Sequence, residues 1–277
     1  ARDAFRTDLG GGTVAGANGS FGGLRREINW DGVPDSASRP NLLPSDFFNL
    51  TSARGAIFFN SHENLFAVSA KSGNPTATPV RFADFDPVYE TKFAAFSAQR
   101  LFASIWDPTY EVKFFVPGTN RPAVVSGFGA IFTDVDLADR SAIEYFDIDG
   151  NSLGRYSVPA ASGDQTFSFL GVSFNGAPAI ARVVVTSGDV AIDGGGEPVG
   201  HDAVAADDFL YSEPVEAENG GCVATPTALC LTATQPGSRR PSPGRPGSSP
   251  DGSPSSRGRH LRRRSAPARA GGTRRPS

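Results

Sequence analysis

The chain has 277 residues, of which 39% are hydrophobic, and its formal net charge is −3 at pH 7. That length allows one large domain or two small ones. No stretch approaches the roughly 20 consecutive apolar residues of a membrane-spanning helix, so the sequence predicts no such helix.

Basic residues are concentrated at one end of the chain. Residues 233–277 contain eleven arginines and one acid, Asp251, whereas residues 1–232 contain 15 basic and 28 acidic residues, a net charge of −13. The basic segment is mainly Pro, Ser, Gly and Arg, so it cannot bury enough apolar surface to offset its chain entropy. We therefore predict a disordered tail. Its arginines lack interleaved aromatic residues and helical spacing, so no nucleic-acid partner is expected.

The arginine bias suggests an origin for this tail. The whole chain has three lysines and 23 arginines, which indicates a GC-rich coding sequence. Such a sequence read out of frame yields mostly Arg, Pro, Ser, Ala and Gly. We interpret residues 233–277 as a frameshifted or degenerate end.

Cys222 and Cys230 are the two cysteines, and they lie eight residues apart. That spacing does not fit a CxxC redox or zinc motif, and no nearby histidine pair completes a metal site. A free pair in a reduced compartment and a local disulfide in an exported protein remain the alternatives, and the second fits the rest of the chain better.

Short apolar or alternating segments bounded by Gly, Pro, Asn and Asp recur between residues 55 and 211, and helical periodicity is nearly absent. The predicted strands are residues 55–60, 65–70, 111–116, 127–133, 142–147, 152–158, 166–174, 180–186 and 207–211. A hairpin turn is expected at Asp149, Gly150 and Asn151. Closely spaced strands rich in Phe, Val and Ile predict an all-β fold, an antiparallel β-sandwich of jelly-roll type, with a closed barrel as the alternative.

The first 50 residues differ from the rest. A glycine-rich stretch precedes RREINWDGVPD at residues 25–35, and several prolines follow. Because prolines at this density disfavour helix interiors and central strands, we expect a long N-terminal loop that wraps over one end of the sandwich. Phe47 and Phe48 would hold it down. The charged residues of 25–35 are expected to pair with one another and to satisfy backbone groups of the loop.

The chain therefore divides into three predicted parts. The β-sandwich occupies residues 1–214, with one short helix near residues 87–96. Residues 215–232 form a linker and the start of an incomplete second domain, and the disordered tail occupies residues 233–277.

Four aspartates are candidate ligands of a structural Ca²⁺ ion. Asp134 and Asp136 are two residues apart, so on a strand they would point to the same face. Asp207 and Asp208 stand at the entrance of the last predicted strand. Calcium takes about six to eight oxygen ligands, and aspartates at strand ends can supply some of them. The alternative is that these residues cap turns and keep strand edges soluble.

The large amphipathic aromatic residues are candidates for ligand binding. We single out Trp30, Trp106 and Tyr110, with Tyr89 as a further candidate, because such rings can stack on a sugar. Trp30 lies in a charged segment and is expected to be exposed. Trp106 lies in IWDPTY, where a place in the core is the alternative.

No catalytic residue is assigned. Glu27 and Asp31 could form the carboxylate pair of a glycoside hydrolase, but acids are plentiful here and such a pair is expected by chance. The sequence contains no Gly-x-Ser-x-Gly, no HExxH and no phosphate-binding loop.

Several motifs in order, REINWDGVPD, LPSDFFN, SGFGAIFTDVD, IEYFDIDG, FSFLGVSF and AADDFLYSEP, resemble an uncharacterised family of exported bacterial proteins. The resemblance covers roughly residues 5–214 and implies an extracytoplasmic β-rich domain without a known activity. DDFLYSEP also resembles the last strand of secreted jelly-roll modules, including carbohydrate-binding ones, which implies a structural calcium at its aspartates. CVATPTALCL resembles the start of a small secreted β-domain that the arginine-rich tail does not complete.

These observations together predict a secreted or cell-surface, non-catalytic binding module. Its expected partner is a polysaccharide or a cell-surface glycan, with calcium as a structural ion. A structural or adhesion protein of the cell surface is the second hypothesis, and a glycoside hydrolase is the third. The sequence leaves the oligomeric state open.

Overall fold

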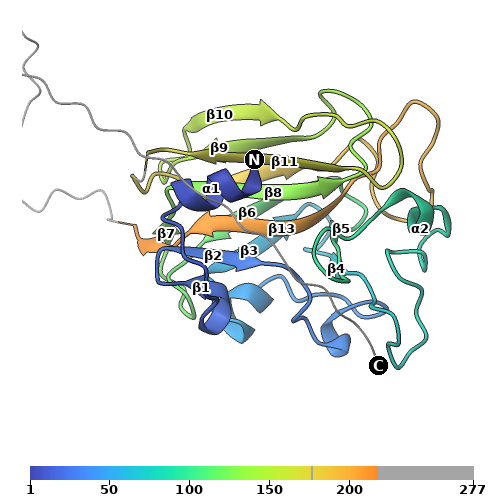
Figure 1. Ribbon diagram of the computed structural model, residues 1–277, viewed down its shortest axis with the longest axis horizontal. Helices are drawn as coiled ribbons and strands as arrows, with labels where there is room; N and C mark the ends of the chain where they lie inside the picture. Colours follow the sequence, from blue (N-terminus) through green and yellow to red (C-terminus); the bar gives the residue numbers. More distant parts are fainter. Residues whose placement is uncertain (176, 218–277) are drawn as a thin grey trace, which may run out of the picture. The chain divides into compact units, whose positions relative to one another are not determined.

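The computed structural model describes residues 1–175 and 177–217, in which two antiparallel sheets pack face to face (Figure 1). The first sheet has the order β1-β2-β13-β5-β4, and β8 pairs with both β13 and β11. Its strands are β1 (Ser20–Phe21), β2 (Arg25–Ile28), β4 (Phe66–Val68), β5 (Phe102–Ser104), β8 (Gly127–Thr133), β11 (Phe167–Ser173) and β13 (Ala205–Ser212).

The second sheet has the order β10-β9-β12-β6-β3. Its strands are β3 (Ala56–Asn60), β6 (Thr109–Phe114), β9 (Ala142–Phe146), β10 (Ser152–Ser157) and β12 (Arg182–Thr186). A separate short pair joins β7 (Ala123–Val124) to β14 (Val215–Glu216). All pairings between these strands are antiparallel, so the protein is an antiparallel β-sandwich of jelly-roll type, as the sequence predicts.

The main core lies between the two sheets. Side chains from the first sheet and the second interdigitate there, among them Ile28, Phe102, Phe128 and Phe209 from one side and Phe58, Val112, Ile143 and Val183 from the other. β6 and β12 alternate buried and half-buried residues, which is the period-two pattern of strands with one face in the core. Their outward residues are half-buried and include the charged Glu111, Lys113 and Arg182, so the outer face of the second sheet is partly open to solvent.

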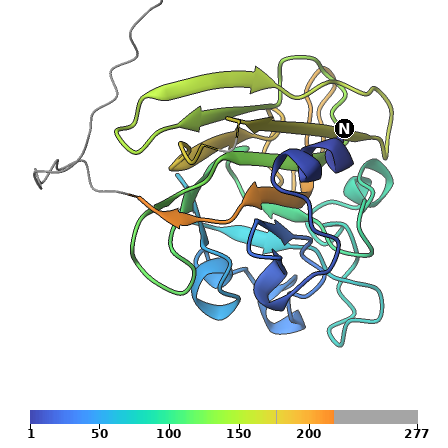
Figure 2. The ribbon, with the colours of Figure 1, turned by 60° about the vertical axis from the view of Figure 1, so that its left-hand side comes forward.

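The outer face of the first sheet is covered instead. β8 and β13 are buried at every residue. The N-terminal helix α1 (Arg2–Asp8) packs Phe5 and Leu9 against Leu210 of β13, beside β11 (Figure 2). A second apolar cluster, built around Phe82 and the short helix α2 (Val88–Lys92), covers the part of the sheet nearer β4 and β5. Within residues 1–175 and 177–217, only the second sheet therefore has an outer face that is not covered.

The strand predictions agree with the structure except at the weakest elements. β8 has the predicted bounds, and each of the other eight predicted strands differs from its observed strand by up to two residues at either end. The hairpin turn between β9 and β10 is confirmed, with Gly150 at φ 86° and Asp147 accepting the backbone N–H groups of Asp149 and Asn151. The predicted helix near 87–96 is shorter and is α2. The short strands β1, β2, β5, β7 and β14 were not predicted.

The N-terminal segment is mostly irregular, but it contains more regular structure than a loop. Residues 25–28, predicted as part of that loop, form β2, which pairs with the central strand β13. One single-turn helix, η1 (Ala17–Gly19), precedes β2 in the chain. Two more follow it, η2 (Asp35–Ala37) and η3 (Phe47–Thr51). Phe47 and Phe48 are buried in the core, as expected.

The charged residues of 25–35 have the supporting role that the sequence predicts. Arg25 donates to the backbone carbonyls of Gly11 and Gly12 and pairs with Glu27. Arg26 pairs with Glu213, at 2.6 Å, and donates to the carbonyl of Ala53. These side chains fix the irregular chain on either side of β2 through charge-assisted hydrogen bonds.

Three sequence predictions fall outside the described residues. The Cys222–Cys230 pair, the incomplete second domain and the tail at 233–277 lie in the segment 218–277. Val215 and Glu216, assigned to the linker, form β14 against β7. Within the described part of the chain, no helix is long and apolar enough to cross a membrane.

Candidate functional site

Trp30 and Tyr110 lie in the core. Each is 1% exposed, so the prediction that Trp30 is exposed is wrong, and neither ring is open to a ligand in this structure. Trp30 lies two residues beyond the end of β2, and its indole N–H donates to the backbone carbonyl of Asp207. Its ring stacks on Phe102 with centroids 4.4 Å apart. Tyr110 alternates inward with Val112 and Phe114 along β6, and Tyr89 is likewise buried, on α2.

Trp106 is on the surface. Its exposed fraction of 51% is higher than that of any other aromatic residue in 1–175 and 177–217. It lies between β5 and β6, and its φ of 60° is uncommon for a residue with a large side chain. Such backbone conformations persist where surrounding contacts hold them in place. The structure therefore presents this indole to solvent on a fixed turn.

Polar side chains surround that turn. Asp107 accepts hydrogen bonds from the backbone N–H of Thr109, at 2.8 Å, and from the hydroxyl of Ser61, at 2.5 Å. The Ser61 hydroxyl also lies 3.2 Å from Nδ1 of His62. Ser61 stands between the acid and the imidazole, so these residues do not form the acid–histidine–serine relay of a hydrolase. They form an exposed polar cluster held by Asp107.

Two aromatic rings on the open face of the second sheet are covered by cations. The guanidinium of Arg182 lies 3.7 Å from the ring centroid of Phe146, and the ammonium of Lys113 lies 4.5 Å from that of Phe59. Both cations also pair with Glu111 of β6. The rings of Phe146 and Phe59 are therefore occupied, whereas the indole of Trp106 carries no such cation in the described residues.

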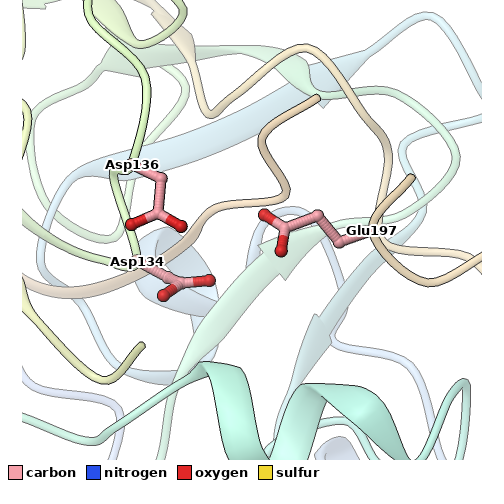
Figure 3. Close-up of side chains that lie close together, drawn as sticks. All are labelled: Asp134, Asp136 and Glu197. Atoms are coloured by element: carbon pink, nitrogen blue, oxygen red, sulfur yellow. The ribbon is translucent and has the colours of Figure 1, made fainter. Parts of the chain in front are cut away.

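An acidic cluster forms where β8 ends. Asp134 and Asp136 follow that strand directly, and Glu197 comes from the glycine-rich segment before β13 (Figure 3). One carboxylate oxygen from each of the three lies within 4.8 Å of the others. Asp202 is buried beside them and accepts the backbone N–H groups of Asp136 and Leu137, both at 3.2 Å, which fixes the chain at Asp136.

Asp134 is the most constrained of the three. It is fully buried, and neither of its carboxylate oxygens has a hydrogen-bond partner. Burial, together with the negative charges of Asp136 and Glu197, raises the pKa of Asp134 to about 8. Desolvation penalises an isolated carboxylate in this way.

Lys92, at the end of α2, is the nearest cation. Its ammonium lies 2.7 Å from Glu197, 2.8 Å from Asp164 and 4.0 Å from Asp136. Hydrogen bonds to Asp164 and Glu197 are the largest causes of its raised pKa. Among the described residues, no ion pair within 4.0 Å joins Lys92 to Asp134. The single positive charge of Lys92 is shared by Asp136, Asp164 and Glu197, and the buried Asp134 has no cationic partner.

Asp207 and Asp208, the other two candidate calcium ligands from the sequence, do not join this cluster. They occupy a bulge in β13. Asp207 accepts the backbone N–H groups of Phe96 and Ser97, and Asp208 lies 3.3 Å from Arg2. Their carboxylates therefore anchor neighbouring segments to the central strand.

Glu27 and Asp31, the candidate hydrolase pair, are also engaged in structural contacts. Both oxygens of Glu27 accept hydrogen bonds from Arg6, at 2.6 and 2.9 Å. Asp31 accepts the backbone N–H groups of Gln99 and Arg100. These contacts account for both carboxylates without a catalytic role.

Sequence reasoning missed Glu197 and Lys92. Glu197 lies in GGGEPVG, 61 residues after Asp136, and nothing in that spacing marks a shared site. Lys92 is one of three lysines in the chain, which is a weak signal that a specific position needs a flexible ammonium.

No family model matches the chain, and no curated protein matches it. A mutant of a family 29 carbohydrate-binding module is 7% identical, covers 44% of this chain and 75% of its own, and has a TM-score of 0.24. The family 32 carbohydrate-binding module of NanJ from C. perfringens, in complex with galactose, is 13% identical over 53% of this chain and 91% of its own, with a TM-score of 0.24. The enzymatically active domain of bacteriophage CBA120 tailspike protein 4 is 10% identical over 62% of this chain and 20% of its own, with a TM-score of 0.23. TM-scores this low establish no common function.

Proposed function

We propose that the chain is a non-catalytic, exported binding module for polysaccharides or cell-surface glycans, and that Trp106 is its sugar-stacking residue. The observation that carries the proposal is the 51% exposure of Trp106 on a fixed turn beside polar groups. A pyranose ring has an apolar face of C–H groups and an edge of hydroxyls. A solvent-exposed indole matches the first, because it is large, rigid and amphipathic.

The polar cluster beside Trp106 supports the same proposal. Ligand sites combine an apolar surface with a few well-placed polar groups that fix the orientation of the ligand. His62 and Ser61 are exposed, and Asp107 is half-buried. Asp107 is already held by Ser61 and Thr109, so a ligand hydroxyl would meet an ordered carboxylate. Ordered groups lose less entropy on binding than flexible ones.

The location of this site is consistent with a binding module. Asn60 of β3 pairs with Tyr110 of β6, which brings the loop after β3 beside the turn that precedes β6. Trp106 and His62 therefore lie at one end of the open second sheet. A glycan bound there would extend over solvent-facing protein and not into the core.

A glycan array with the purified protein tests the proposal. The wild type is expected to bind at least one class of glycan, and Trp106→Ala is expected to lose at least tenfold in affinity. Tyr156→Ala is the matched control, because Tyr156 is a 41% exposed aromatic residue on β10, at the far edge of the same sheet. Equal binding by wild type and Trp106→Ala would refute the assignment, and a folded wild type that binds no glycan would favour a structural role at the cell surface.

Export is a separate part of the proposal. Fractionation of cells that express the natural gene is expected to place the protein outside the cytoplasm. Recovery in the cytoplasmic fraction alone would contradict it and would leave the sugar-binding test unaffected.

A further inference from the structure

We propose that Asp134, Asp136 and Glu197 bind a calcium ion that ties the end of β8 to the segment preceding β13. This site differs from the one that the sequence suggests, since it includes Glu197 and excludes Asp207 and Asp208. It is independent of glycan binding at Trp106. Figure 3 shows the three carboxylates directed toward a common space from two segments of the chain.

The strongest observation is the state of Asp134. Its carboxylate is fully buried, it faces the other two acids, and both of its oxygens lack a partner. Buried polar atoms in proteins are almost always satisfied, and an ionised carboxylate is among the most costly to leave alone. A cation between the three acids would satisfy Asp134.

The spacing of the oxygens fits one ion. Ligands that each lie about 2.3–2.6 Å from a calcium ion can be at most about 5 Å apart. The three carboxylate oxygens lie within 4.8 Å of one another, so a single ion can reach all of them. A larger separation would have required rearrangement of the backbone.

The chemistry of the donors selects the metal. All three are carboxylates, with no histidine or cysteine among the acidic group, which favours a hard cation over zinc or copper. Magnesium needs nearly ideal octahedral geometry, whereas calcium tolerates irregular sets of six to eight or so oxygens and completes them with water. Asp136 and Glu197 have partly accessible side chains, at 23% and 7%, so water can enter from their side.

Lys92 is compatible with the ion. Its ammonium bonds to Asp164, which is 55% exposed and lies outside the acidic group, at 2.8 Å. The Lys92–Asp164 pair keeps the ammonium bound when the carboxylate of Glu197 coordinates the metal ion. Lys92 therefore acts as a partial substitute for the ion in the metal-free protein and does not block the site.

Thermal unfolding with and without calcium tests the proposal. After treatment with chelator, added CaCl₂ at a hundredfold excess over Kd is expected to raise the Tm of the wild type by about 5–10 °C. Asp134→Asn is expected to lose this response.

Matched variants make the result specific. Asp164→Asn contacts Lys92 but lies outside the site, and it is expected to keep the calcium response. Asp208→Asn removes an acid of the bulge in β13 and is expected to keep it as well. If Asp134→Asn fails to fold, Asp136→Asn, which is more exposed, provides the same test through loss of calcium binding in isothermal titration calorimetry.

The outcomes separate this proposal from the glycan proposal. No Tm shift and no heat of binding with millimolar CaCl₂ would overturn the site. A calcium response that survives in both Asp134→Asn and Asp136→Asn would also overturn it. Loss of glycan binding in Trp106→Ala with an intact calcium response would support both proposals as separate properties of the protein.

Discussion

The indole N–H of Trp30 donates a 2.9 Å hydrogen bond to the backbone carbonyl of Asp207, which links the segment after β2 to the bulge in the central strand β13. The same ring stacks on Phe102 and meets the edges of Phe48 and Phe209. The tryptophan of the charged segment is thus a packing centre of the sandwich.

Trp30→Ala is expected to lower the free energy of unfolding by about 3–5 kcal/mol, because it leaves a large cavity and an unpaired carbonyl. Trp106→Ala is expected to change it by less than about 0.5 kcal/mol, because that side chain is exposed. Urea denaturation measures both. A comparable loss of stability in the two variants would contradict the assigned positions of the two tryptophans.

Glu27 neutralises two arginines at the interface of α1 and β2. Arg25 is 2% exposed and pairs with Glu27, which also pairs with Arg6. Glu27→Ala is expected to destabilise the protein by about 3–5 kcal/mol, because a buried charge loses its partner. Glu27→Gln keeps the shape and the acceptor oxygen and is expected to cost less. Chemical denaturation measures the free energy of unfolding of both variants. Values equal to that of the wild type would contradict this account.

The bulge in β13 makes stability depend on pH. Burial and the neighbouring charge of Asp208 raise the pKa of Asp207 above its ordinary value of 3.8. The folded state then holds a proton that the unfolded state releases, so the associated stability is complete below about pH 4 and is lost as the pH rises through the folded-state pKa.

Asp207→Asn should remove that dependence. Its amide oxygen can accept the two backbone N–H groups of Phe96 and Ser97 that Oδ2 of Asp207 accepts, and the amide carries no charge at any pH. Relative to this variant, the wild type is expected to lose up to about 1.4 kcal/mol of unfolding free energy for each pH unit between the pKa of Asp207 in the unfolded state and its pKa in the folded state. Parallel stability profiles for the two proteins from pH 4 to 9 would contradict the raised pKa.

Lys92 holds the acidic cluster together when no metal is bound. In the presence of chelator, Lys92→Met is expected to lower the free energy of unfolding by about 1–3 kcal/mol. Glu197, whose side chain is 7% exposed, loses its ion pair in this variant. The same variant is expected to bind calcium more tightly, because a competing cation is gone. Calorimetric titration tests the second effect, and weaker calcium binding than in the wild type would contradict it.

Sequence periodicity was sufficient for the strands of the sandwich and insufficient for its first 50 residues. β8 was predicted to the residue because it is a long apolar run bounded by polar residues. β2 was missed because only four residues, RREI, form it, and their charges read as a loop. Those charges are buried through ion pairs made with α1 and Glu213, and local sequence does not encode such distant partners.

The candidate sites show the same limit. Asp134 and Asp136 were recognised because they are close in sequence. Glu197 was missed because it lies 61 residues after Asp136 in the sequence, and the fold brings its carboxylate within 4.8 Å of the other two. Trp30 was predicted to be exposed from its charged neighbours, but its ring packs on Phe102 and its N–H bonds to Asp207, both distant in sequence. Contacts between segments distant in sequence therefore determine which of these side chains are buried and which acids meet, and local composition does not predict such contacts.

The two tryptophans allow the central claim to be tested directly by fluorescence. Trp30 is buried and Trp106 is exposed, so their emission maxima differ. Titration with the glycan identified on the array is expected to change the red-shifted emission of Trp106 in the wild type and to leave Trp106→Phe without that response. A change in the blue-shifted emission of Trp30 with no change at Trp106, or no change at either residue at saturating glycan, would contradict the proposal that Trp106 is the sugar-stacking residue.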